Sequence, residues 1–99
     1  MATEVFAIGP DISPGLAIHP GEVLAEELRA RRLTQKALAE ALQRPPQAVS
    51  EIVNGRKRIT AQTALELEQV LGTPARAWLG LQMEYDLVAA RIAASRRAG

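Results

Sequence analysis

Cysteine is absent from this 99-residue sequence, which excludes disulfide scaffolds, thiolate metal sites and cysteine nucleophiles. Histidine occurs once, at His19, so one chain holds no histidine cluster for a metal ion. No apolar run reaches the about 18 residues that a membrane-spanning helix needs, and no basic start followed by an apolar stretch marks a secretory signal. We therefore expect a cytoplasmic protein with no membrane segment, no metal and no cofactor.

Aromatic residues are also scarce, at 3% of the chain, whereas 18 residues are alanine. This composition favours closely packed helices over a β-sandwich. Hydrophobic residues make up 47%, a normal share for a globular protein, and the length fits one domain with a small core. The composition predicts a single all-α domain.

Charge is distributed unevenly along the chain, although the net charge is only +1. Residues 1–28 carry five acids and no lysine or arginine, whereas residues 29–58 carry eight bases and two acids. Residues 59–88 are again net acidic, and residues 89–99 are basic. A basic zone between acidic flanks indicates a polyanion on one face and a second, basic partner elsewhere. The alternative is a set of solvated surfaces.

Apolar periodicity and capping residues predict five helices and no sheet. Residues 1–18 contain two prolines and two glycines, show no helical period and are expected to form an extended arm. The first helix opens at His19-Pro20. The other four are expected from Gln35 to about Leu42, from Pro46 to about Val53, from Thr60 to about Leu71, and from Thr73 to about Ser95.

The second and third expected helices have the spacing of a helix-turn-helix, since a turn of three or four residues joins them. Pro45 places this turn, because it disfavours helical geometry in the residue before it. In such a motif the first helix braces, and the second projects side chains into a DNA major groove. Four inward-facing residues are spaced to clamp the two helices together: Leu38, Ala39, Val49 and Ile52.

The stretch from Leu33 to Asn54 resembles the helix-turn-helix of the phage-repressor (XRE/Cro) family, in which a Thr-Gln pair opens the bracing helix. Residues 19–85 are similar to one branch of that family, the HigA-type antitoxins of toxin–antitoxin modules. Each matching segment is weak evidence alone, but their order and spacing are specific. The segments are His19-Pro20-Gly21-Glu22, Leu33-Thr34-Gln35, Leu38-Ala39, Pro45-Pro46, Glu51 to Gly55, Ile59-Thr60-Ala61, Thr63-Ala64-Leu65, Gly72-Thr73-Pro74, Trp78-Leu79, Leu81-Gln82 and Tyr85-Asp86-Leu87.

This resemblance implies a five-helix, phage-repressor-like DNA-binding domain. It implies an antitoxin of a type II module that represses its own operator as a homodimer and neutralises a RelE-like or HigB-like mRNA endoribonuclease. Residues 19–72 would form the helix-turn-helix core, and residues 73–99 a C-terminal helix for core packing and dimerisation. One departure is Gln43, which stands where the family usually has a glycine and a positive φ is favoured. A non-glycine residue can take this conformation at a cost of about 1 kcal/mol, and a reshaped turn is the alternative.

The resemblance also implies which residues meet DNA. Gln47 and Ser50 should face base edges, and Gln47 has the amide that reads adenine. Glu51 should lie near a cytosine or a bridging water. Pairing with Arg44 or Arg56, or a local capping role, is the alternative. Thr34 has helix capping as an alternative or additional role. The expected phosphate contacts are Thr34, Gln35, Lys36, Arg44, Asn54, Arg56, Lys57 and Arg58.

No pattern in the sequence indicates catalysis. His19 has neither a serine–aspartate pair nor metal-ligand spacing, so a helix-start or packing role is expected. Glu22 and Glu26 share a helix face, but a surface salt bridge or a partner contact explains them better than acid catalysis. With Glu27 they form the expected contact with a basic toxin, and the fifth helix is the rival surface.

An apolar stripe runs along the fifth expected helix, and a neighbouring stripe makes that helix apolar over more than one face. The helix is longer than a four-helix core of this size needs. We expect one face to pack on the core and the other on a second copy, whereas burial within one domain is the alternative. The expected dimerisation residues are Trp78, Leu81, Tyr85, Val88 and Ile92.

Three functions fit the sequence, and the leading one is an antitoxin that also represses its operon. The second is an XRE-family transcriptional regulator without a toxin partner. The third is a protein-binding scaffold that has lost DNA binding, against which Gln47 and the run from Arg56 to Arg58 argue. An enzyme is a distant fourth.

Overall fold

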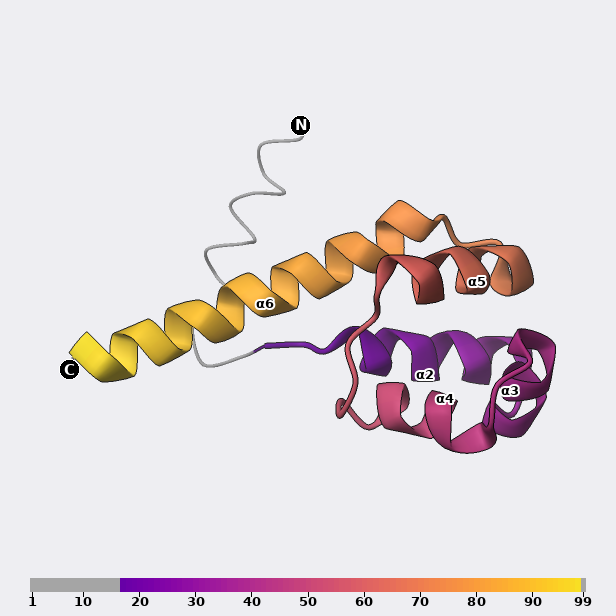
Figure 1. Cartoon of the computed structure of the whole chain (residues 1–99). Coiled ribbons are helices and arrows are strands. Elements are labelled where there is room, and N and C mark those ends of the chain that lie inside the picture. The colour runs from indigo at the N-terminus through magenta and orange to yellow at the C-terminus, as the bar shows by residue number, and fades with distance from the viewer. Residues whose placement is uncertain (1–16, 99) are drawn as a thin grey trace.

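The computed structural model describes residues 17–98 as helices joined by short connections (Figure 1). The helices are α2 (Pro20–Arg31), α3 (Gln35–Leu42), α4 (Pro46–Val53), α5 (Ala61–Leu71) and α6 (Ala75–Ala98). No strand occurs between residues 17 and 98, so the predicted all-α fold with five helices is confirmed. The predicted arm of residues 1–18 lies outside the described residues, except for its last two.

Three helices start at side-chain caps. The side chains of His19, Thr34 and Thr60 accept a hydrogen bond from a first-turn N–H of α2, α3 and α5, at 2.9, 3.0 and 3.2 Å. These N–H groups have no carbonyl partner within their own helix, so each cap stabilises a helix end. Helix α4 starts instead with Pro46 at its first position and has no side-chain cap, because its N-cap residue, Pro45, has no side-chain acceptor. Pro46 is tolerated there because the first N–H of a helix has no partner within the helix.

One apolar core joins the five helices. Trp78 of α6 has no exposed surface and belongs to one cluster with buried side chains from the four other helices. Fully burying one large apolar side chain stabilises the fold by about 1.5–3 kcal/mol. Several buried side chains of this kind hold α3 and α4 together. The buried apolar residues are Leu24, Leu28, Leu38, Ala39, Val49, Ile52, Ile59, Ala64, Leu67, Leu71 and Trp78.

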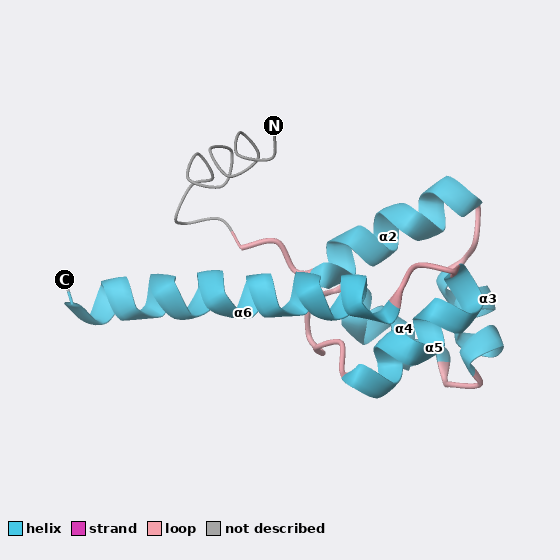
Figure 2. Ribbon diagram, turned by 90° about the horizontal axis from the view of Figure 1, so that it is seen from above, coloured by secondary structure: helices cyan, strands magenta, loops and turns pink. Residues whose placement is uncertain are grey.

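Helix α6 is longer than the core on which it packs. It contacts α5 and α2, and its buried residues Trp78 and Gln82 lie in its N-terminal half. Figures 1 and 2 show the C-terminal half projecting away from the other helices. With 24 residues, the helix is about 36 Å long. It runs to Ala98 rather than to the predicted end near Ser95.

Candidate nucleic-acid interface

The turn between α3 and α4 keeps its geometry although it lacks glycine. Gln43 adopts a left-handed conformation with φ 59° and ψ 44°, and its N–H donates to the carbonyl of Glu40 at 3.0 Å. The N–H of Arg44 donates to the carbonyl of Ala39 at 2.9 Å. These bonds close the C-terminus of α3, as a glycine cap would. Of the two alternatives left open for Gln43, the structure shows the first: the residue takes the positive φ, at a conformational cost.

Helix α4 presents polar side chains on the side opposite the core. Val49 and Ile52 are buried, whereas Gln47 is exposed and Glu51 is half-buried. The Nε2 group of Gln47 donates to Oε2 of Glu51 at 3.3 Å, one helical turn away. Glu51 thus orients the amide that we expect to read a base. Its carboxylate forms no ion pair with Arg44 or Arg56, so that alternative is not found.

The remaining predicted residues of α4 pair with each other. The Nδ2 group of Asn54 donates to Oγ of Ser50 at 3.2 Å, again across one turn. Asn54 is exposed at the C-terminal end of the helix, and Ser50 is half-buried. Their polar groups extend the surface that Gln47 and Glu51 begin.

A basic loop follows α4 and is tied to it through backbone bonds. The N–H groups of Arg56 and Lys57 donate to the main-chain carbonyl of Glu51 at 2.8 and 3.2 Å. Both side chains are exposed, and neither forms an ion pair within residues 17–98. Two positive charges therefore stand at the end of α4, where a DNA backbone would provide partners.

The N-terminus of α3 carries three of the predicted phosphate contacts. Thr34, Gln35 and Lys36 are all exposed. Oγ1 of Thr34 accepts from the N–H of Ala37 at 3.0 Å, which confirms its capping role. The other N–H groups of this first turn lie at the positive end of the helix dipole, where a phosphate is favoured.

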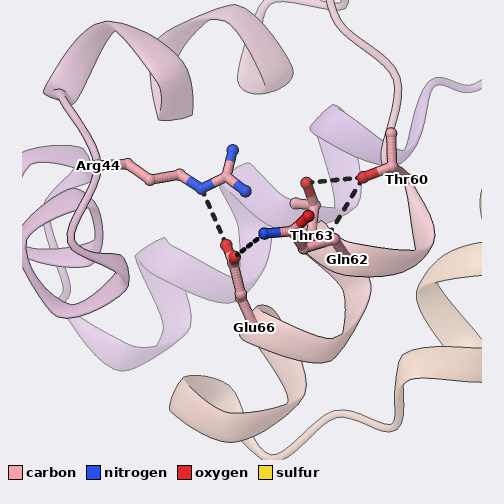
Figure 3. A network of polar contacts seen from close by, with 5 residues as sticks. All are labelled: Arg44, Thr60, Gln62, Thr63 and Glu66. Carbon is pink, nitrogen blue, oxygen red and sulfur yellow. Dashed lines mark hydrogen bonds and ion pairs between the residues drawn. The ribbon is translucent and has the colours of Figure 1, made fainter.

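Arg44 is held by an acid on α5. Its Nε group donates to Oε1 of Glu66 at 2.9 Å, and Gln62 donates to the other carboxylate oxygen at 3.2 Å (Figure 3). The hydrogen bond from Arg44 holds the pKa of Glu66 below its usual value, so this carboxyl stays ionised. Arg44 therefore has a competing partner to any phosphate.

Arg58 is also paired, in a network that the sequence did not indicate. Its guanidinium donates to Asp86 on α6, with Nη2 to Oδ2 at 2.8 Å and Nη1 to Oδ1 at 3.5 Å. Gln82 donates to Oδ1 of Asp86 at 3.0 Å and accepts from the N–H of Ile59 at 2.7 Å. These contacts tie the loop after α4 to α6.

His19 has the structural role expected for it. Its Nδ1 accepts from the N–H of Gly21 at 2.9 Å, so the ring caps α2 in its neutral form. The ring also meets Tyr85 edge-on, with centroids 4.8 Å apart. Burial lowers the pKa of His19, although the negative charges of Glu22 and Asp86 act to raise it.

The structure corrects the predicted dimerisation stripe at its N-terminal end. Trp78 has no exposed surface, so its assignment to a dimer contact is wrong: the indole packs into the core of its own chain. Leu81 packs against the same core, and Tyr85 lies against His19. Val88 and Ile92 lie further along α6 and keep partly exposed side chains.

The acids predicted to meet a toxin lie on α2. Glu22 and Glu26 are exposed one turn apart, whereas Glu27 pairs with Arg31 at 3.0 Å. Glu26 lies 3.9 Å from Arg29 in a looser pair. The acidic surface is thus centred on Glu22 and Glu26 rather than spread equally over three residues.

No group of histidine, aspartate and glutamate side chains within residues 17–98 is arranged to hold a metal ion. None of the five described helices is both long enough and apolar enough to cross a membrane.

Comparisons with known proteins agree with this geometry. Residues 24–78 match the family described as helix-turn-helix. Virulence-associated protein I of Dichelobacter nodosus is 49% identical over 72 residues, which cover 72% of this chain and 67% of that protein.

Two solved structures show the same fold. An addiction module antidote protein of the HigA family from Coxiella burnetii superposes with a TM-score of 0.76 at 41% identity, covering 82% of this chain and 89% of that one. The antitoxin HigA of Pseudomonas aeruginosa, solved with the higBA promoter, gives a TM-score of 0.78 at 36% identity. Here the alignment covers 84% of this chain and 91% of that one.

Proposed function

Because the chain belongs to the HigA-like branch of the XRE-type helix-turn-helix family, we propose that it is the antitoxin of a type II module. In this proposal it binds its own operator as a homodimer in the cytoplasm and neutralises a RelE-like or HigB-like toxin. As a member of this family it is a DNA-binding regulator and not an enzyme, as its sequence predicted.

The outer face of α4 is the observation that best supports sequence-specific binding. Gln47 is exposed, and its amide is oriented by Glu51 at 3.3 Å. A glutamine amide can donate to N7 of adenine and accept from its N6 amino group. This pair of hydrogen bonds is worth about 1–3 kcal/mol of discrimination against the wrong base. Ser50 and Asn54 continue this face. We therefore assign base reading to α4 and phosphate contacts to the residues around it.

A matched pair of variants tests this division of roles. Gln47→Ala should lower operator affinity about 5- to 150-fold while leaving affinity for random duplex unchanged. Arg56→Ala should weaken binding to both and flatten the logarithmic salt slope by about 0.9 for each phosphate that the side chain no longer neutralises. Fluorescence anisotropy at several salt concentrations measures both effects. If Gln47→Ala leaves operator affinity intact, α4 does not read the operator in this way.

Dimerisation is proposed for the C-terminal half of α6. Val88 and Ile92 are apolar and partly exposed, and they belong to the C-terminal half of α6. Figures 1 and 2 show this half extending beyond the other helices. A second copy would cover them and would bring two recognition helices to two half-sites. Two linked half-sites raise affinity beyond what one domain provides.

The dimer surface is tested by introducing charge. A Val88→Asp and Ile92→Asp double variant should be a folded monomer in light scattering and should bind the operator more weakly. Leu65→Asp is the matched control, because Leu65 is an exposed apolar residue of α5, a helix that lies away from the projecting half of α6 (Figure 1). A double variant that remains dimeric places the dimer interface elsewhere.

Toxin neutralisation is proposed to use the acidic surface of α2. A RelE-like toxin must bind mRNA, so a basic surface is expected on it, which Glu22 and Glu26 complement in charge. Co-expression with the neighbouring open reading frame tests the pairing through copurification and growth rescue. Charge reversal at Glu22 and Glu26 should abolish rescue and spare operator binding. Copurification that survives this reversal moves the toxin contact to another surface, such as α6.

The alternative is a transcriptional regulator of the same family without a toxin partner. A protein described as an HTH-type transcriptional regulator in Haemophilus influenzae is 40% identical to this chain over 68 residues. A neighbouring gene whose product is neither toxic nor bound by this chain favours this alternative.

A further inference from the structure

Arg58 lies between two recesses on the surface. One, of about 250 Å³, is on the side of the recognition helix and is lined by Glu51 and Lys57 together with Arg58. The other, of about 370 Å³, is on the side of α6 and is lined by Met83, Asp86 and Arg58. The side chain of Arg58 can extend toward either recess. In this structure it extends toward α6, where its guanidinium pairs with Asp86 at 2.8 Å.

Asp86 is a fixed acceptor rather than a freely moving surface acid. Gln82, one turn earlier on α6, donates to Oδ1 of Asp86 at 3.0 Å. Gln82 is itself buried and accepts from the main-chain N–H of Ile59 at 2.7 Å. The carboxylate is therefore held next to Arg58 before the arginine binds it, which lowers the entropy lost on pairing. The hydrogen bond from Arg58 also keeps the pKa of Asp86 below its usual value.

The other two bases of the same loop have no such partner among residues 17–98. Arg56 and Lys57 are exposed and are positioned through their N–H groups alone, by the carbonyl of Glu51. Of these three consecutive basic residues, only Arg58 therefore has its charge paired with an acid of this chain. If Arg58 turned to a phosphate, Asp86 would be left as an unpaired negative charge beside the DNA, which repels the duplex.

We propose that Asp86 takes the place of a DNA phosphate at Arg58 and thereby keeps this arginine off the operator backbone. Arg56 and Lys57 then carry the phosphate contacts of the loop. Asp86 is a positioning residue in this account, and it sets the affinity for every DNA sequence below what the loop would otherwise give. The inference rests on the DNA-binding surface proposed above.

The test is a double-mutant cycle on operator and random duplex. Asp86→Asn keeps an oxygen for Gln82 but removes the charge that holds Arg58. It should raise affinity for both duplexes about two- to five-fold and steepen the salt slope by about 0.9 for each Arg58 that reaches a phosphate. Arg58→Ala should leave the salt slope unchanged in the wild-type background, because it removes no phosphate contact. It should lower affinity for both duplexes less than Arg56→Ala does, because it leaves Asp86 without its cationic partner. It should also cancel the gain of Asp86→Asn.

Two controls separate this inference from simpler effects. Glu84→Gln removes an exposed negative charge from the same helix without releasing an arginine, so it should leave the salt slope unchanged. Arg56→Ala should flatten the slope in every background. Thermal unfolding followed by circular dichroism checks that each variant is folded. If Asp86→Asn does not fold, the salt slope of Arg58→Ala still shows whether Arg58 contacts a phosphate.

The outcomes distinguish this inference from the proposed function. An Arg58→Ala variant that loses as much affinity and slope as Arg56→Ala overturns the inference, because Arg58 then contacts phosphate. The same holds if Asp86→Asn lowers affinity or leaves it unchanged. If wild-type protein binds no DNA specifically, the proposed function itself fails.

Discussion

Gly21 is the position where one added methyl group should do the most damage to the fold. It lies near the start of α2, and α2 contacts α4. A Cβ built at Gly21 would overlap the carbonyl oxygen of Ile52 and would lie 2.8 Å from the carbonyl carbon of Ile52 and 3.0 Å from the carbonyl oxygen of Val53. All three atoms belong to the main chain of α4, so no side chain can rotate away.

The cost of Gly21→Ala follows from this contact. The substitution requires α2 and α4 to separate, and overpacking of this kind costs about 3 kcal/mol or more when the backbone must move. A domain of this size has a stability of about 5–15 kcal/mol. Since 1 kcal/mol shifts Tm by about 4–8 °C in a domain of 60–100 residues, Tm should fall by about 12–24 °C. Because the contact is with the C-terminal end of α4, operator binding should weaken as well.

Gly80 provides a matched control for this substitution. It lies within α6, and a Cβ built there meets no atom within 4 Å. Gly80→Ala should therefore stabilise the protein by about 0.5–1 kcal/mol, through helix propensity alone. Thermal and urea unfolding followed by circular dichroism compare the two variants. A Gly21→Ala variant that melts within 2–3 °C of the wild type, roughly the error of a 0.5 kcal/mol estimate, would show that α2 and α4 do not approach so closely.

Two further predictions concern single residues. Gln43→Gly should raise the free energy of unfolding by about 0.5–1 kcal/mol, because glycine takes a φ of 59° without the cost that glutamine has. The urea midpoint should rise accordingly, and a lower midpoint would contradict the strained turn. His19 has a lowered pKa in the folded protein, so below its unfolded value of about 6.5 the unfolded state binds more protons. The contribution of His19 to stability should therefore be fully present above about pH 6.5 and be lost as pH falls below that value. His19→Asn should flatten this dependence, which unfolding at several pH values would measure.

The helices were predictable because their signals are local. Thr34 and Thr60 cap helices whose apolar positions follow at helical spacing, and Pro46 starts α4 where its missing N–H costs nothing. Such signals involve residues within one or two turns of each other, so sequence spacing determines them. The position of α6 was harder to predict. Its continuous apolar pattern does not show that Trp78 enters the core whereas Val88 remains partly exposed, since this depends on where the other helices end.

Long-range charge pairing was the part of the candidate site that the sequence could not indicate. A count of the basic residues in residues 29–58 treats all of them as available to DNA, whereas the fold pairs some of them with acids. It pairs Arg44 with an acid 22 residues later and Arg58 with one 28 residues later, at 2.9 and 2.8 Å. Both acids come from the stretch that looked like an acidic flank. Of the basic residues predicted to contact phosphate, only Lys36, Arg56 and Lys57 are free of ion pairs among residues 17–98. The positive charge available to the proposed DNA-binding surface is therefore smaller than the charge count implies.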